Sequence, residues 1–136
     1  MKTSYLKKNI LKSEWNNYRT LFGYWIAMLF LVFTGSFMPF SSVVHMIMFI
    51  DTATHLLLYS VLAFIPMILL QNRKTALLIS LAMTPVGYLL EWLHIMVTDG
   101  SFSALNVFAN NIGVFAGMSA GFVIRLKNHY SHEENR

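Results

Sequence analysis

Long apolar runs separated by short polar segments dominate this sequence. Four of them lie at residues 20–40, 51–70, 75–96 and 106–124. At a helical rise of about 1.5 Å per residue, each has the length that a helix needs to cross a hydrocarbon core of about 30 Å. A helix that is apolar on all sides buries its surface in lipid or in a protein core. The pattern predicts an all-α integral membrane bundle of four transmembrane helices.

Helix-breaking and polar residues mark the predicted connections. Pro39 ends the first run, and residues 43–50 are apolar but too short to span, so they either lie in the membrane interface or extend the next helix outward. Residues 71–74 form a tight polar turn, and residues 97–105 form the next loop. The chain therefore divides into an N-terminal segment (1–19), a membrane domain (20–127) and a polar tail (128–136).

The first run has an alternative interpretation as a cleaved signal peptide. Its apolar stretch is longer than the core of such a peptide, and no small-residue cleavage site follows it. These two features favour its retention as a membrane anchor.

Composition and charge agree with membrane spans. The chain is 56% hydrophobic and 12% charged, and Asp51 is the only charged residue between Arg19 and Arg73. An ordinary soluble domain carries about twice that charged fraction, so a water-soluble surface is not expected. The absence of cysteine excludes disulfides, thiolate metal sites and a cysteine nucleophile.

The basic residues predict the orientation of the chain. They occur in residues 1–19, in the Arg73–Lys74 turn and after residue 124, which places all of them on one side of a four-span bundle. Because cytoplasmic loops carry the excess of Lys and Arg, we expect both termini to be cytoplasmic in a multi-pass protein of the cytoplasmic (inner) membrane. The net charge of +4 is then a topology signal, and nucleic acid is not an expected partner.

Acidic residues inside spans are costly and suggest function. In the predicted orientation, Asp51, Glu91 and Asp99 all lie toward the outer face. Residues three or four apart share one side of a helix, so Asp51, His55 and Tyr59 form one stripe. Glu91 and His94 form a second pair, close enough to share a proton. We expect Glu91 to face the bundle interior.

The fourth span brings amides and small residues to the same outer layer. Asn106, Asn110, Gly113 and Gly117 fall within a narrow arc of this helix. The glycines are expected to let a neighbouring helix approach closely, and the amides to hydrogen-bond between helices. The predicted ligand-binding site therefore consists of Asp51, His55, Tyr59, Glu91, His94, Asn106 and Asn110.

The spacing of these residues resembles that of the VanZ-like membrane protein family. The resemblance covers Asp51-x-x-x-His55-x-x-x-Tyr59, Glu91-x-x-His94 and Asn106-x-x-x-Asn110-x-x-Gly113-x-x-x-Gly117. Thr52, His94 and Asn106 stand where the family pattern has Lys, Gln and Asp. The resemblance implies a small multi-span protein of the cell envelope, in a family named for teicoplanin resistance, most of whose members have no assigned reaction.

Three functions compete at this stage. The favoured one is a non-enzymatic protein that binds a lipid headgroup or a lipid-linked cell-envelope precursor, without cofactor or metal. The second is a membrane-embedded, metal-dependent lipid-phosphate hydrolase or transferase that uses Asp51, His55, Glu91 and His94. The third is a proton-coupled carrier. The catalytic residues of any reaction stay unknown, the lipid bilayer is an expected partner, and a homo-oligomer is left open.

Overall fold

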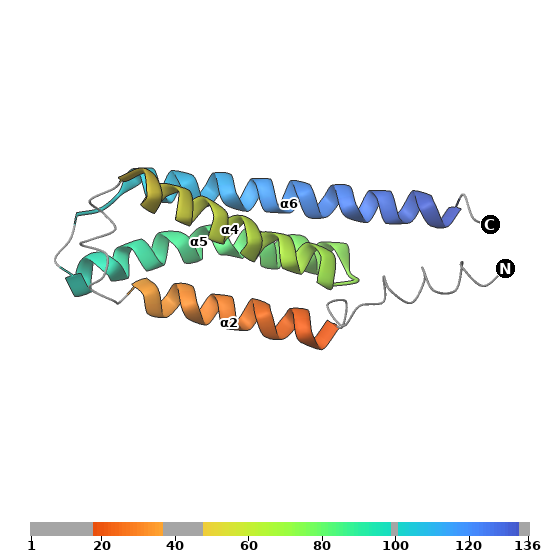
Figure 1. Ribbon diagram of the computed structural model, residues 1–136, viewed down its shortest axis with the longest axis horizontal. Helices are drawn as coiled ribbons and strands as arrows, with labels where there is room; N and C mark the ends of the chain where they lie inside the picture. Colours follow the sequence, from red (N-terminus) through yellow and green to blue (C-terminus); the bar gives the residue numbers. More distant parts are fainter. Residues whose placement is uncertain (1–17, 37–47, 99–100, 134–136) are drawn as a thin grey trace.

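The computed structural model describes residues 18–36, 48–98 and 101–133. Within these ranges the chain forms the helices α2 (Tyr18–Ser36), α4 (Met48–Leu69), α5 (Arg73–Thr98) and α6 (Ala104–Glu133), and no strand. The helices run alternately up and down along one axis (Figure 1). All four are long and apolar enough to cross a membrane. The predicted all-α membrane bundle is confirmed, and the chain is a multi-pass membrane protein.

The helices extend beyond several of the predicted spans. α4 begins at Met48, so residues 48–50 extend the helix of the second span at its N-terminal end, and α5 begins at Arg73, which shortens the predicted polar turn. α6 continues to Glu133, through most of the predicted polar tail. Residues 125–133 contain no Pro or Gly, so nothing in the sequence ends the helix there. Predictions for residues 1–17, 37–47 and 99–100, Asp99 included, lie outside the described residues.

Large apolar side chains cover the outside of the bundle. Phe30, Leu78 and Phe108 are exposed by 68%, 67% and 63%, and they lie on three different helices. A soluble monomer rarely exposes apolar surface on this scale, so the outer faces are suited to lipid. The interior holds a compact cluster of buried side chains, with Tyr59, Leu62, Ala63, Met83 and Val114 at its centre.

The most extensive contact in the bundle joins α4 to α6 along glycines spaced four residues apart. A Cβ atom added at Gly113 would overlap the carbonyl oxygen of Leu56, and one at Gly117 would overlap that of Ser60. Small residues at this spacing let two helix backbones touch. The close approach predicted for Gly113 and Gly117 is confirmed, and Gly121 extends it along the same face.

The turn between α4 and α5 is fixed by two polar side chains. The Oδ1 of Asn72 accepts the backbone N–H groups of Lys74 at 3.0 Å and Thr75 at 3.4 Å, which is the N-cap arrangement for α5. Arg125 of α6 donates to three backbone carbonyls at the end of α4, those of Met67, Leu70 and Gln71, at 2.7 to 2.8 Å. The guanidinium thus satisfies carbonyls that have no partner within their own helix.

The described Lys and Arg residues gather at one end of the bundle. α2 and α5 begin at this end, and α4 terminates there beside the last part of α6 (Figure 1). We call it the basic end, and it is formed by Arg19, Arg73, Lys74, Arg125 and Lys127. The opposite end, where α2 and α5 terminate and α4 and α6 begin, is called the polar end below.

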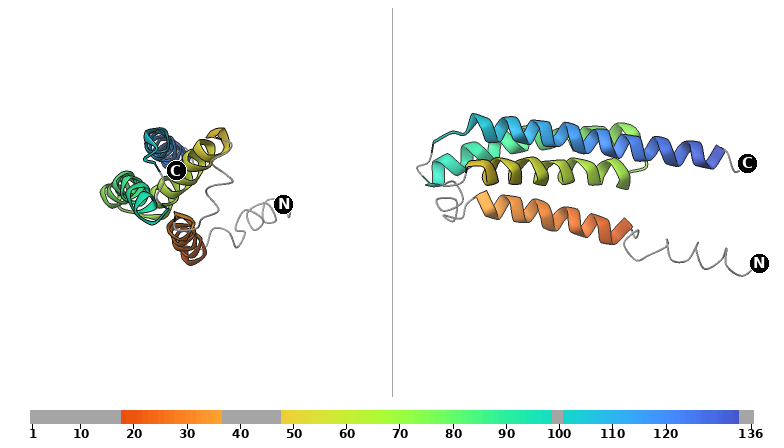
Figure 2. Two further views of the ribbon diagram at one scale, coloured as in Figure 1. Left: turned by 90° about the vertical axis from the view of Figure 1, so that its left-hand side faces the viewer. Right: turned by 45° about the horizontal axis from the view of Figure 1, so that its top comes forward.

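α2 is the most peripheral of the four helices. It packs against α4 and α5 and lies away from α6, as the view along the axis shows (Figure 2). None of its residues is buried. One hydrogen bond links α2 to α4, in which the indole N–H of Trp25 donates to the carbonyl of Leu62 at 2.9 Å. α2 therefore forms one wall of the bundle's interior without contributing to its buried core.

Candidate functional site

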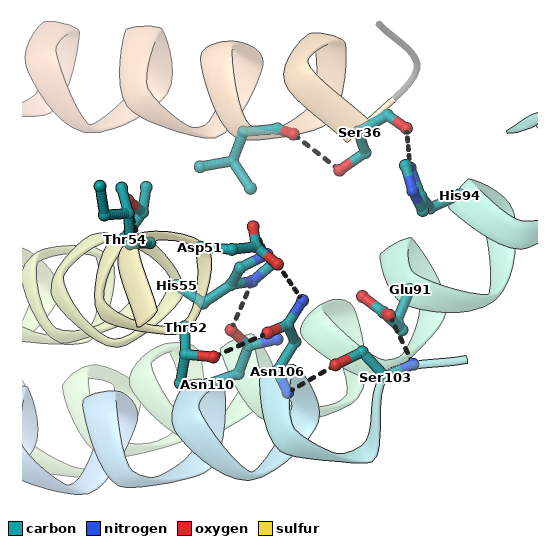
Figure 3. A network of polar contacts seen from close by, with 12 residues as sticks. Ser36, Asp51, Thr52, Thr54, His55, Glu91, His94, Ser103, Asn106 and Asn110 are labelled. Atoms are coloured by element: carbon teal, nitrogen blue, oxygen red, sulfur yellow. Dashed lines mark hydrogen bonds and ion pairs between the residues drawn. The ribbon is translucent and has the colours of Figure 1, made fainter. Parts of the chain in front are cut away.

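A cavity of about 270 Å³ lies at the polar end, with walls from all four described helices. Apolar side chains form much of its surface, and we call it the polar cavity after the ionisable residues among them. Six of the seven predicted site residues line it, and the seventh, Asn110, is hydrogen-bonded to His55. Figure 3 labels all of these side chains except that of Tyr59 and shows them gathered between the helices. The wall residues from the predicted site are Asp51, His55, Tyr59, Glu91, His94 and Asn106.

The stripe on α4 forms a continuous column of side chains. Nε2 of His55 lies 3.6 Å from Oδ1 of Asp51, which makes an ion pair when the ring is protonated. One turn further into the bundle, the rings of His55 and Tyr59 stack with 6.4 Å between their centroids and 8° between their planes. Tyr59 is only 2% exposed. The i, i+4 spacing thus directs three polar side chains along one side of the cavity.

The two predicted amides of α6 hold α4 through hydrogen bonds. Nδ2 of Asn106 donates to Oδ2 of Asp51 at 2.7 Å, and Oδ1 of the same amide lies 3.4 Å from the hydroxyl of Thr52. Nδ1 of His55 lies 3.0 Å from Oδ1 of Asn110. Both asparagines are almost fully buried. The expected bonding of these amides between helices is confirmed.

Glu91 is buried inside the bundle, as expected, with 6% of its surface exposed. Its Oε1 accepts the backbone N–H of Ser103 at 3.0 Å, and the hydroxyl of Ser103 in turn accepts the N–H of Asn106 at 3.2 Å. Ser103 is the N-cap of α6. A carboxyl group on α5 therefore fixes the residue that starts α6, a backbone contact that helical spacing does not reveal.

His94 is directed toward α2. Its Nδ1 lies 2.9 Å from the carbonyl oxygen of Ser36 at the end of that helix, and Ser36 also lines the cavity. A ring nitrogen that carries hydrogen donates to this carbonyl. The contact closes the cavity on the α2 side. No sequence signal pointed to Ser36.

Gly87 of α5 is a site residue that the sequence pattern did not single out. A Cβ atom there would lie 2.9 Å from Nδ2 of Asn110 and 2.9 Å from Cε1 of Tyr59. That Nδ2 is buried and has no hydrogen-bond partner in the described part of the protein. The glycine therefore leaves room for two buried polar side chains at the inner end of the cavity.

The donor set does not suit a metal ion. Within residues 18–36, 48–98 and 101–133, no three His, Asp or Glu side chains are grouped so that they could hold one. The candidate metal-ligating side chains of Asp51, His55 and Glu91 are bonded mostly to amides and backbone groups from other helices. This geometry gives the metal-dependent hydrolase or transferase no support.

Comparison of the chain with protein-family models, with curated proteins and with solved structures found no match. The resemblance to the VanZ-like family therefore rests on the motif residues quoted above and stays a prediction.

Proposed function

We propose that this chain is a non-enzymatic membrane protein that binds the headgroup of a lipid, or of a lipid-linked cell-envelope precursor, in the polar cavity. The observation that carries the proposal is a cavity lined by two carboxylic acids, two imidazoles and a phenol inside a bundle whose outside is apolar. Ionisable groups within spans are expensive to keep, which favours a functional role for them.

The size of the cavity supports a headgroup as the ligand. Pockets for drug-sized molecules occupy about 300–1,000 Å³. At about 270 Å³, the cavity matches a small polar group better than an entire lipid. The hydrocarbon part of the ligand would then remain among apolar side chains or in the bilayer. The VanZ-like resemblance supports an envelope lipid as the source of the headgroup, in a protein of the teicoplanin-resistance type in the inner membrane.

We propose further that both termini are cytoplasmic, so that the polar end faces outward. The gathering of described cations at the basic end supports this orientation, because positive residues flank the cytoplasmic ends of spans. Alkaline phosphatase fused after Arg136 is expected to be inactive in intact cells, whereas a cytoplasmic reporter at the same position is expected to be active. An active phosphatase fusion would place the polar cavity in the inner leaflet.

Lipid binding is testable on the detergent-extracted protein. Native mass spectrometry is expected to show one lipid species enriched about tenfold over its share of the bulk membrane. A tenfold gain in affinity is about what one hydrogen bond to a charged group contributes to binding. Glu91→Gln should lower the enrichment, because it removes the charge while its amide oxygen still accepts the N–H of Ser103.

A matched control for this variant exists at the basic end. Gln71→Glu makes the reverse exchange at an exposed residue outside the cavity, and the enrichment should be unchanged. Lipid adducts that simply mirror the bulk membrane in the unmodified protein would contradict the proposed function.

A further inference from the structure

The charge of the cavity wall restricts the headgroup. Asp51 and Glu91 contribute carboxyl groups, and none of the described residues that line the cavity is Lys or Arg. The described cations lie instead at the basic end. A headgroup of net negative charge placed in the cavity would face like charges, with only the imidazoles of His55 and His94 as potential cations, which disfavours binding. The wall is complementary to a group that is positively charged and donates hydrogen bonds.

The carboxyl group of Glu91 has capacity for such a group. Glu91 is more than nine-tenths buried, and while its Oε1 accepts the N–H of Ser103, its Oε2 makes no hydrogen bond within the described residues. Figure 3 shows the carboxyl groups of Asp51 and Glu91 turned toward the space between α4 and α5. An ammonium group carries three donors and forms short, strong bonds to carboxylates.

An apolar groove lies next to the polar cavity, on the side toward the basic end. Its volume is about 350 Å³, and it lies between α2 and the α4–α5 pair. Val32, Tyr59 and Leu90 line both spaces, so the two lie next to each other. The other groove residues are Ile26, Leu29, Phe30, Phe33, Leu62 and Val86, all of them apolar.

The groove is long enough for part of a hydrocarbon chain. From Phe33 to Ile26 along the groove, α2 rises by about 10 Å. The hydrocarbon of one leaflet, half of a core of about 30 Å, is about 15 Å deep. A lipid whose headgroup occupies the cavity would therefore have one chain lying along the groove, parallel to α2.

We infer that the ligand is a membrane lipid with a primary ammonium in its headgroup, bound with the ammonium between Asp51 and Glu91 and one hydrocarbon chain in the groove beneath α2. The inference rests on the proposed function and specifies its ligand. It accounts for two features at once, which are a cavity wall with two carboxyl groups and no described Lys or Arg, and the apolar groove beside it.

The headgroup is tested by native mass spectrometry of the full-length protein in nanodiscs. These contain phosphatidylethanolamine, phosphatidylcholine and phosphatidylglycerol in equal amounts with identical acyl chains. Phosphatidylethanolamine should be retained about tenfold over phosphatidylglycerol, and over phosphatidylcholine, whose quaternary nitrogen has no N–H donor. Glu91→Gln should reduce this preference, and Gln71→Glu should preserve it.

The groove is tested by filling it. Ile26→Trp adds bulk at a half-exposed groove residue outside the cavity, and it should lower lipid retention several-fold. It should leave the weak binding of soluble glycerophosphoethanolamine unchanged. If that soluble headgroup binds as tightly as the intact lipid, the chain contributes nothing and the groove assignment is overturned.

The remaining outcomes separate the two proposals. Equal retention of the three lipids, each above its bulk share, would overturn the ammonium inference and leave headgroup binding in place. Preferential retention of phosphatidylglycerol would do the same. Retention of no lipid above its bulk share would overturn the proposed function itself.

Discussion

Gly117→Ala is expected to destabilise the bundle by about 3 kcal/mol, at the upper end of what overpacking a protein interior costs. The added Cβ would overlap the backbone carbonyl of Ser60, and a second neighbour is the backbone nitrogen of Phe64. Backbone atoms of a packed helix cannot rotate away as a side chain does. α4 and α6 would have to separate along the whole contact. Titration with SDS, followed by circular dichroism, measures the loss.

Gly23→Ala is the matched control for this variant. Gly23 also lies inside a predicted span, in α2, and nothing lies within 4 Å of a Cβ atom added there. Alanine is favoured over glycine in a helix by about 1 kcal/mol, so this exchange should be neutral or slightly stabilising. Equal stability of the Gly117 and Gly23 variants would show that the α4–α6 contact does not depend on close backbone approach.

Asn106→Leu is expected to cost about 3 kcal/mol as well, because it removes a hydrogen bond to a charged group inside a low-dielectric bundle. The amide of Asn106 bonds to Asp51 at 2.7 Å and lies 3.4 Å from the hydroxyl of Thr52, and leucine replaces neither contact. The start of α6 should therefore separate from α4. Hydrogen exchange in residues 101–110 should accelerate relative to the basic half of α6.

Asn111→Leu provides the comparison on the same helix. Asn111 is partly exposed and makes no hydrogen bond with a described residue, so its replacement should change stability by no more than about 0.5 kcal/mol. If both asparagine variants lose stability alike, the effect comes from added apolar surface and the bond to Asp51 is not what holds the two helices together.

The layer of polar residues could be predicted because helical spacing and apolar run length are visible in a sequence. Asp51, His55 and Tyr59 repeat every four residues, and the span boundaries place Glu91 at a similar depth on another helix. The same reasoning placed Gly113 and Gly117 against a neighbouring helix. In each case a regular helix converts sequence distance directly into position.

Contacts that involve irregular backbone could not be predicted in this way. The partner of Glu91 is the N–H of Ser103 at the start of α6, and that of His94 is the carbonyl of Ser36 at the end of α2. Backbone groups are present at every residue, so no residue type marks them as partners. Their positions depend on how each helix is rotated and where it terminates. The space that Gly87 leaves for Asn110 and Tyr59 also depends on how the helices are rotated against each other, so the sequence did not reveal it.

α6 supplies hydrogen-bond donors to acidic groups on two other helices, since Asn106 donates to Asp51 and the N–H of Ser103 donates to Glu91. It is also the last of the described helices to leave the ribosome. Until it inserts, α4 and α5 reside in the translocon or the bilayer without these donors, and an acidic residue inside a span is costly without a partner. Biogenesis of the site is thus completed only when α6 inserts, and a nascent chain arrested before it would expose two acidic residues to membrane quality-control proteases.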